Sequence, residues 1–257
     1  MDLQLTGKVA IVTGASRGIG RSIALALSRE GMRLVLVARS QALLEDTAAT
    51  ASTACLVHAA DLREAGAAQA VIDAALGKFG NIDVLVNNAG ATKRGDFLEL
   101  PDSDWDDGFA LKFFGAMRLC RAAWPHLKAR QGSIVNIVGV GGRTGSAEFT
   151  IGGSVNSALL NLTKALAHRG IKEGIRVNAI NPGSIATERL QVRIDAVASE
   201  EKLSRDAAAG KMAQALGVAR FGGPEEIARA VAFLASPAAG YCQGAIVDID
   251  GGQTRTL

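Results

Sequence analysis

The sequence predicts an α/β fold with one doubly wound, seven-stranded parallel sheet that helices cover on both faces. Short apolar runs rich in β-branched residues alternate with longer segments whose apolar residues recur about every 3.6 positions. The runs are mostly apolar and do not alternate with polar residues, which is typical of parallel strands buried on both faces. No linker or internal repeat interrupts the 257 residues, so we expect a single domain over 1–257.

Seven runs predict the strands of this sheet. In chain order they are KVAIVT at 8–13, LVLVA at 34–38, CLVHA at 55–59, IDVLVN at 82–87, SIVNIV at 133–138, RVNAI at 176–180 and AIVDI at 245–249. Each has the length of a buried strand rather than that of a helix. The segments between them are long enough to carry the crossover helices that parallel strands require.

Amphipathic segments between the runs predict these helices. IGRSIALALSREG at 19–31 has helical periodicity, and EFTIGGSVNSALLNLTKALA at 148–167 passes from small residues into a Leu-rich stripe. The polar, Ala-rich region 187–223 is the least regular part of the chain. We interpret it as a lid over a substrate crevice, because mobile surface segments often close over bound ligands.

Composition excludes several classes of function. The net charge is +3, and the basic residues are intermixed with 25 acidic ones, so no patch for nucleic acid is expected. Cys55, Cys120 and Cys242 are odd in number and far apart, which fits buried thiols and predicts neither a disulfide framework nor a metal site. No basic leader and no apolar run of about 20 residues is present, so we expect a cytoplasmic protein without a membrane partner.

The turn TGASRGIG at 13–20 predicts a site for a dinucleotide in a Rossmann fold. Gly14 permits a tight turn, Gly18 lets the backbone approach a pyrophosphate, and Gly20 lets the following helix pack against the strand. The helix N-terminus then offers free N–H groups to the anion. The remaining residues of the predicted phosphate loop are Ser16, Arg17 and Ile19.

The end of the second strand favours NADP(H) over NAD(H). An NAD-selective site places an acid there for the ribose hydroxyls, but this chain has Ala38 followed by Arg39. Arg17 and Arg39 could together bind a 2′-phosphate, because guanidinium groups pair with such anions in a bidentate manner. The alternative is that both are ordinary solvated surface arginines.

The chain resembles the short-chain dehydrogenase/reductase family, close to its 3-oxoacyl reductases. The motifs that carry the resemblance are TGASRGIG at 13–20, Asp61–Leu62, NNAG at 87–90, INPGSIAT at 180–187, RFGGPEEIARAVAFLAS at 220–236 and GAIVDIDGG at 244–252. The resemblance implies contacts of Asp61 and Leu62 with adenine, of Asn88, Ala89 and Gly90 with its ribose, and of Pro182, Gly183, Ile185 and Thr187 with the nicotinamide carboxamide. Alternatively, NNAG only stabilises the sheet and Pro182–Gly183 is only a turn.

The resemblance also implies a catalytic tetrad, and this chain lacks all four residues. A Tyr protonates the carbonyl oxygen, a Lys lowers the pKa of that Tyr, a Ser holds the carbonyl and an Asn positions a water. The Asn position falls at Lys112, the Ser position at Gly139, the Tyr position at Gly152 and the Lys position at Asn156. The chain has a single Tyr, Tyr241, and no shift of register brings it into the helix at 148–167.

Some of the lost chemistry could be replaced. Asn156 can still hydrogen-bond a ribose hydroxyl, and Lys112 could restore positive charge beside the nicotinamide. Lys112 could instead form a salt bridge with Glu148 or be exposed. The two glycines are expected to enlarge the pocket, and the lid shows no charged group that would select a substrate.

These observations lead to three functional hypotheses. The first is an NADP(H)-binding protein of this family that has absent or very weak carbonyl reduction and acts as a sensor or a partner subunit. The second is an NADPH-dependent reductase of 3-oxoacyl or other ketones that uses a relocated group such as Lys112, and the third is a lyase or isomerase. A small molecule is expected in the nicotinamide-side pocket. The small-residue face of the helix at 148–167 predicts a homotetramer, or a hetero-oligomer with an active homologue.

Overall fold

The computed structural model describes residues 2–255, and its fold confirms the predicted class. Within these residues, one seven-stranded sheet has the order β3-β2-β1-β4-β5-β6-β7, and every neighbouring pair is parallel. Each predicted run coincides with a strand: β1 (Val9–Thr13), β2 (Arg33–Ala38), β3 (Cys55–Ala59), β4 (Val84–Asn87), β5 (Ser133–Ile137), β6 (Arg176–Pro182) and β7 (Ile246–Ile249).

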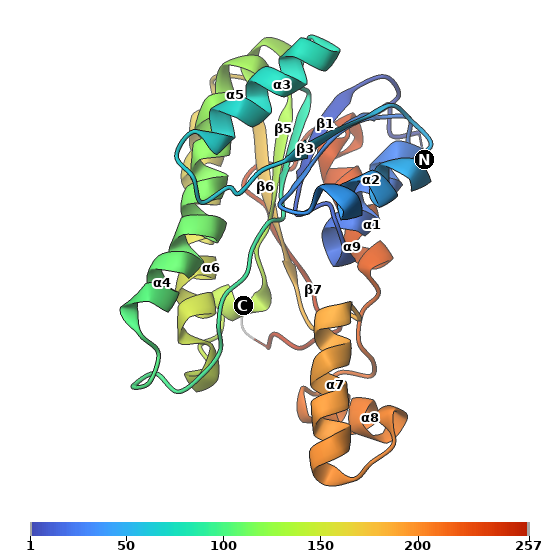
Figure 1. The fold of residues 1–257 in the computed structure, drawn as a ribbon. Helices are drawn as coiled ribbons and strands as arrows, with labels where there is room; N and C mark the ends of the chain where they lie inside the picture. Colours follow the sequence, from blue (N-terminus) through green and yellow to red (C-terminus); the bar gives the residue numbers. More distant parts are fainter. Residues whose placement is uncertain (1, 256–257) are drawn as a thin grey trace.

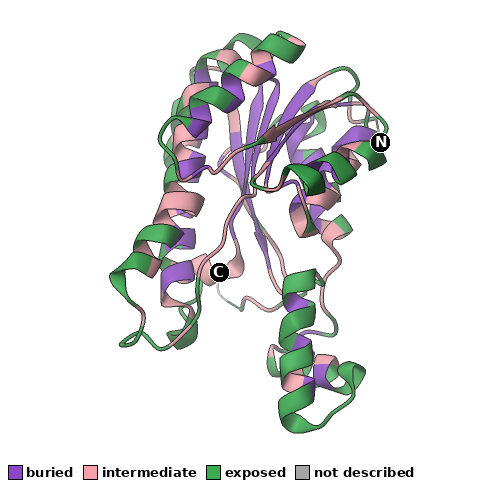
Figure 2. Cartoon of the chain, viewed as in Figure 1, coloured by how far each residue is buried: buried purple, intermediate pink, exposed green. Residues whose placement is uncertain are grey.

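Helices cover both faces of the sheet (Figure 1). One face carries α1 (Gly18–Arg29), α2 (Gln41–Thr50) and α9 (Pro224–Ala235), and the other carries α3 (Ala67–Phe79), α5 (Ala116–Arg130) and α6 (Thr150–Ile171). Alternate residues of β1 contribute to the two apolar clusters, Val12 to one and Ile11 to the other. This explains why the strand is mostly apolar, and Figure 2 shows the sheet as a buried layer.

The strand order places a ligand-binding edge between β1 and β4. The chain proceeds outward from β1 to β3 on one side and from β4 to β7 on the other, so the direction of winding reverses between these two strands. In doubly wound sheets, ligands bind outside the carboxyl ends of the strands at this reversal. The glycine loop follows β1 and the NNAG motif follows β4 at this same edge.

A long interrupted helix passes along the outer face beside α6. It consists of α4 (Asp102–Gly108), the π-helical segment η1 (Phe109–Gly115) and α5. Such π-helical segments are rare and often occur at functional sites. Lys112 lies within η1, so the irregular backbone coincides with one of the four expected catalytic positions.

The proposed lid is more regular than the sequence indicated. It contains α7 (Glu188–Glu201) and α8 (Arg205–Ala215), whose apolar residues Leu190, Ile194 and Ala208 pack into a small cluster of their own. In Figure 1 this helical pair projects from the body beyond the carboxyl ends of the strands. Its role as a lid remains a prediction.

Short helical turns complete the described chain: η2 (Val140–Gly142), η3 (Ala147–Phe149) and η4 (Pro237–Ala239). No helix within residues 2–255 is both long and apolar enough to cross a membrane. Within the same range, His, Cys, Asp and Glu side chains form no group of three or more that could hold a metal ion.

Candidate functional site

The glycine loop between β1 and α1 has the geometry predicted for it. Gly14 has φ +65° and Gly18 has φ +54°, values that favour glycine over any L residue. A Cβ on Gly20 would lie 2.1 Å from the carbonyl oxygen of Gly14, so α1 can approach this turn only with glycine there. Arg17 precedes α1 without capping it through its side chain. The first N–H groups of α1 therefore face outward without intrahelical partners, as an anion site requires.

The NNAG motif holds this loop in position. Asn88 donates from Nδ2 to the carbonyl oxygen of Thr13 at 3.0 Å, and Thr13 Oγ1 accepts the N–H groups of Asn88 at 2.9 Å and Ala89 at 3.0 Å. A Cβ on Gly14 would come within 2.7 Å of Asn88 Nδ2. The side chain of Asn88 thus has the structural role considered as an alternative, and it fixes the loop on which nucleotide binding would depend.

A cleft of about 410 Å³ separates the glycine loop from the beginning of the lid. Ser16, Arg17 and Gly18 line one side, and Thr187 and Glu188 line the other. Arg17 Nη1 lies 3.8 Å from Glu188 Oε2, and both side chains are largely exposed. The cleft has the size and backbone donors suited to a phosphate-bearing ligand.

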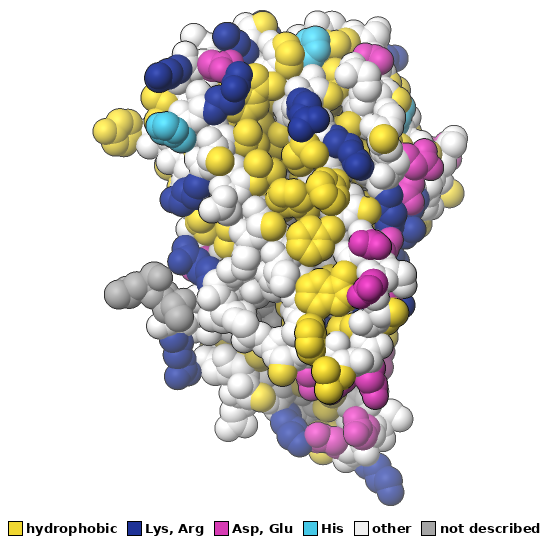
Figure 3. All heavy atoms as spheres, turned by 90° about the vertical axis from the view of Figure 1, so that its left-hand side faces the viewer, with side chains coloured by type: hydrophobic (Ala, Val, Ile, Leu, Met, Phe, Trp, Pro, Cys, Tyr) yellow, Lys and Arg dark blue, Asp and Glu magenta, His cyan; other side chains and the backbone are white. Residues whose placement is uncertain are grey.

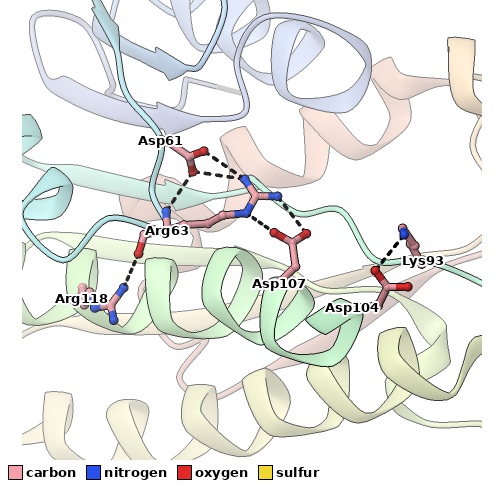
Figure 4. A network of polar contacts seen from close by, with 6 residues as sticks. All are labelled: Asp61, Arg63, Lys93, Asp104, Asp107 and Arg118. Atoms are coloured by element: carbon pink, nitrogen blue, oxygen red, sulfur yellow. Dashed lines mark hydrogen bonds and ion pairs between the residues drawn. The ribbon is translucent and has the colours of Figure 1, made fainter. Parts of the chain in front are cut away.

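After the end of β3, charged residues form a network with α4 (Figure 4). Arg63 bonds Asp61 at 3.1 Å through Nη1 and Asp107 at 3.0 Å through Nη2, joining the loop after β3 to α4. Burial acts to raise the pKa of Asp61, but hydrogen bonds and charge from Arg63, together with the charge of Arg39, lower it on balance. Arg39 is exposed at this edge, and the neighbouring Ala38 leaves it without the acid of an NAD-selective site.

The residues expected near the nicotinamide form a tight turn after β6. Pro182 and Ile185 are buried, and a Cβ on Gly183 would lie 2.7 Å from the Cα of Asp250. Thr187 immediately precedes α7, and its side chain makes no capping bond to that helix. Its methyl group lies 3.4 Å from the position a Cβ on Gly18 would take, so the turn reaches the glycine loop.

Three of the four expected catalytic positions meet at the carboxyl end of β5. Lys112 Nζ donates to the carbonyl oxygen of Val138 at 2.6 Å, and Gly139 follows with φ +132°, a conformation that L side chains rarely adopt. A Cβ on Gly139 would lie 3.1 Å from Nδ2 of Asn156. Asn156 is 3% exposed, and its buried Oδ1 has no hydrogen-bond partner within residues 2–255. The site therefore contains a free buried acceptor that a ligand hydroxyl could satisfy.

The fourth position, Gly152, is covered by the ring of Phe149. A Cβ on Gly152 would lie only 2.0 Å from Cζ of Phe149, and a Cβ on Gly141 would lie 3.0 Å from the same ring. The expectation that the two glycines enlarge the pocket is therefore wrong at Gly152, because the aromatic ring fills the space beside it. The absence of a side chain at this position is what allows the ring to pack there.

Lys112 is neither paired with Glu148 nor exposed, the two alternatives that the sequence left open. It is half-buried, and it makes no ion pair with Glu148 or any other acid within residues 2–255. A Cβ on Gly90 would lie 2.9 Å from its Cδ, which places the stem against the NNAG motif. Burial, and secondarily the charge of Arg189, lowers the pKa of Lys112 to about 8.

Sequence reasoning missed Phe149 and Arg94. The guanidinium carbon of Arg94 lies 4.0 Å from the centroid of the Phe149 ring, a cation–π arrangement on the ring that lies beside the expected Tyr position. These two residues are far from each other in the sequence and belong to no motif, so only the fold brings them together. Arg189 and Arg193 of α7 also act on this site through their charge, contrary to the expectation of a lid without a charged group.

Comparisons with known proteins agree on one family. The family described as Enoyl-(Acyl carrier protein) reductase matches residues 14–254. The chain is 34% identical over 254 residues to the 3-oxoacyl-[acyl-carrier-protein] reductase FabG of Staphylococcus aureus, covering 95% of this chain and 97% of the relative. It is 35% identical over 254 residues to the 2-dehydro-3-deoxy-D-gluconate 5-dehydrogenase of Escherichia coli, covering 96% of each.

A solved structure supports the same assignment. The L-sorbose reductase of Gluconobacter frateurii, crystallised with NADPH and L-sorbose, matches this chain with a TM-score of 0.96 and 32% sequence identity. The match covers 100% of both chains. The fold described above is therefore shared over its full length with a reductase that holds NADPH.

Proposed function

Because the chain belongs to the short-chain dehydrogenase/reductase family, we propose that it binds NADP(H) but has absent or very weak conventional carbonyl reduction. The observation that carries this proposal is the Phe149 ring over Gly152, where the resemblance places the proton-donating Tyr. An apolar ring at that point can neither donate a proton nor hold a carbonyl oxygen. The nucleotide site around the glycine loop has no comparable defect.

The residues present fit an NADP(H) molecule. The N-terminus of α1 and the strained turn at Gly14 and Gly18 offer backbone donors to a pyrophosphate. Arg39, at the end of β2, supplies a guanidinium for a 2′-phosphate. The buried Oδ1 of Asn156 can accept a hydrogen bond from a ribose hydroxyl, a contact that satisfies an otherwise unpaired acceptor.

The missing acid sets the limit on the chemistry. The reduced cofactor supplies a hydride, and the carbonyl oxygen that accepts it as an alkoxide needs a proton donor and a positive environment. Gly139 and Gly152 provide no hydroxyl group, and Asn156 provides no positive charge. Loss of positioned general-acid help typically costs about 10²–10⁴-fold in rate.

A specific observation favours a second candidate, an NADPH-dependent ketone reductase that uses Lys112. Its ammonium bonds the carbonyl oxygen of Val138, next to Gly139, and its pKa lies near 8. An amine with that pKa is largely protonated at neutral pH and releases its proton more readily than an ordinary lysine. One of its three N–H donors bonds Val138, and another could protonate a product alkoxide.

One pair of measurements tests both candidates. Calorimetric titration with NADPH should show binding, and failure to bind would overturn the proposed nucleotide site. NADPH oxidation with a panel of ketones and 3-oxoacyl thioesters should be absent or very weak in the wild type. A Lys112→Ala variant that loses measurable oxidation while retaining NADPH affinity would favour the second candidate. Ordinary turnover of about 1–10³ s⁻¹ in the wild type would contradict the first.

Assembly and location are part of the proposal. We propose a homotetramer formed through the α5 and α6 face, or a hetero-oligomer with an active homologue that contributes the missing chemistry. The small-molecule ligand would lie on the nicotinamide side of the site. The three cysteines are free thiols, which supports a reducing compartment such as the cytoplasm.

A further inference from the structure

Arg94 stacks on the aromatic ring that lies beside the expected catalytic position. Its guanidinium stacks at 4.0 Å from the centroid of the Phe149 ring, and that ring covers Gly152. The segment that carries Arg94 is fixed by a main-chain hydrogen bond of 3.2 Å from Gly95 to Glu148. The stacking holds one face of the guanidinium and leaves the N–H groups at its edge available to another molecule.

Two further arginines approach the same place from the lid. Arg189 and Arg193 are four residues apart on α7, so they lie on one face of that helix. Burial lowers the pKa of Arg94, and the charges of Arg193 and Arg189 lower it further, whereas Glu148 opposes them. The charge of Arg189 also contributes to lowering the pKa of Lys112, after burial.

Arg94, Arg189 and Arg193 lack acidic partners among the described residues, whereas other arginines of the lid region have them. Arg205 pairs with Asp195 at 2.6 Å, and Arg220 pairs with Glu226 at 2.8 Å. Within residues 2–255, no carboxylate forms an ion pair with Arg94, Arg189 or Arg193. Glu148 is the one acid that acts on Arg94, so positive charge is in excess at this point.

A hydroxyl group at the beginning of α6 has no partner within residues 2–255. Thr150 follows Phe149, and its Oγ1 is buried without a hydrogen-bond partner among the described residues. Buried hydroxyl groups are normally satisfied.

We propose that Arg94, Arg189 and Arg193 bind the anionic group, a carboxylate or a phosphate, of a small molecule whose other end lies over the nicotinamide side of the site. The inference rests on the proposed function for the position of the nucleotide and extends it by naming the charge of the ligand. Guanidinium groups bind carboxylates and phosphates in a bidentate manner, and several of them around one site select anions over neutral molecules.

The test uses a matched pair of probes and the full-length protein. Binding of 4-oxopentanoate and of its neutral methyl ester is measured by calorimetry, with the protein free and saturated with NADPH. Inorganic phosphate is titrated separately, so that a preference for phosphate is distinguished from one for carboxylate. The variants are Arg94→Gln, Arg189→Gln and Arg193→Gln, and the control is Arg205→Gln, which removes the same charge from the lid away from this site.

The expected result is that an anionic probe binds more tightly than the neutral ester. Each of the three variants should weaken its binding by about 10- to 150-fold, the scale of one hydrogen bond to a charged group, and the control should leave it unchanged. Circular dichroism of each variant confirms that it is folded. Measurement on the free protein keeps this result separate from nucleotide binding.

Three results would overturn the inference. The first is equal affinity for 4-oxopentanoate, phosphate and the ester, and the second is anion binding that survives in all three variants. The third is a loss of NADPH affinity in the Arg189→Gln and Arg193→Gln variants with no change for the anionic probes, which would assign these arginines to the nucleotide phosphates. A protein that fails to bind NADPH but binds the anion through these residues would overturn the proposed function alone.

Discussion

At the scale of single residues, Arg39 determines the expected nucleotide preference. It lies exposed at the end of β2, its charge reaches Asp61, and no acid occupies the adjacent Ala38. Arg17 is less suited to the 2′-phosphate because it faces Glu188 across the glycine-loop cleft. The sequence assigned Arg17 and Arg39 together to one 2′-phosphate site, and the structure favours Arg39 alone for this contact.

An Arg39→Ala variant should bind NADPH more weakly and NADH with unchanged affinity. Removal of a charged hydrogen-bond donor to the 2′-phosphate should cost about 1.5–3 kcal/mol, or roughly 10- to 150-fold in Kd. Calorimetric titration of both nucleotides measures the ratio. An Arg29→Ala variant, which removes an exposed arginine from the far end of α1, serves as the control, and an equal loss for NADPH and NADH in Arg39→Ala would refute the assignment.

The lowered pKa of Lys112 predicts a pH dependence of stability. In the folded protein this pKa is about 8, below the ordinary value of 10.5, because burial and Arg189 disfavour the charged form. Between these two values the unfolded chain binds more protons, so the contribution of Lys112 to the free energy of unfolding rises with pH. Urea unfolding at about pH 7 and about pH 9.5 should show the wild type gaining stability relative to Lys112→Met. A constant difference between the two proteins would show that the pKa is not depressed.

Some residues of the candidate site could be assigned from the sequence, and others could not. Gly14, Gly18 and Gly20 could be assigned because each obeys a local geometric requirement within one motif. Phe149 and Arg94 could not, because their contact depends on how the chain after β4 passes over the beginning of α6. The ring that fills the space at Gly152 belongs to no motif, and neighbouring side chains decide its position.

At the scale of elements, the η2–η3–α6 segment decides whether the Tyr and Lys of the family can be accommodated in this chain. Gly152→Tyr together with Asn156→Lys recreates the Tyr and Lys of the family, but the new Tyr would collide with the Phe149 ring. We expect ketone reduction by the pair only when Phe149→Ala is added, with a gain of about 10²-fold or more over either single change. NADPH oxidation measures it, and equal rates with and without Phe149→Ala would contradict the steric argument.

A Ser at position 139 is a less promising addition than the sequence suggests. Gly139 has φ +132°, so any side chain there strains the backbone. Its Cβ would also lie 3.1 Å from Asn156 Nδ2. Gly139→Ser should therefore lower the free energy of unfolding by about 1–3 kcal/mol, a loss that urea denaturation would detect.

The lid should open independently of the body. The apolar cluster of α7 and α8 is formed among residues of the lid region, and Lys202 between the two helices is exposed with φ +54°. Trypsin should cleave first after Lys202, and NADPH should slow this cleavage by holding Thr187 against the glycine loop. Cleavage after the exposed Lys172, in the loop before β6, provides the control. Identical protection of both sites would argue against local closure of the lid.

The strands could be predicted from the sequence because each of them has to present apolar residues to the helices on both faces of the sheet. A parallel strand covered on both faces is mostly apolar, and β1 is buried along its whole length. The lid was mistaken for an irregular segment because α8 is rich in Ala and buries only Ala208 and Ala213, which leaves a weak periodic signal. A helix that packs mainly against one neighbouring helix needs few apolar residues.

At the scale of the whole molecule, apolar side chains are concentrated on one outer face. Figure 3 shows hydrophobic side chains gathered along the face formed by α5 and α6. Phe114 is 40% exposed there, and Phe113 and Leu162 are half-buried. The small-residue stripe proposed for this contact is divided in the structure, since Gly152 and Leu159 face inward. Large exposed apolar patches mark interaction sites, so this face supports the proposed assembly.

The assembly prediction can be tested on this face. The wild type should have about four times the mass of one chain in light scattering at micromolar concentration, because twofold contacts combine readily into tetramers. Phe114→Glu introduces a charge into the apolar face, and it should reduce the mass to that of a dimer or a monomer. Val192→Glu, which alters an equally apolar residue that is 69% exposed on the lid, should leave the mass unchanged. A monomeric wild type would leave the apolar face of α5 and α6 open, and it would favour the alternative in which an active homologue covers it.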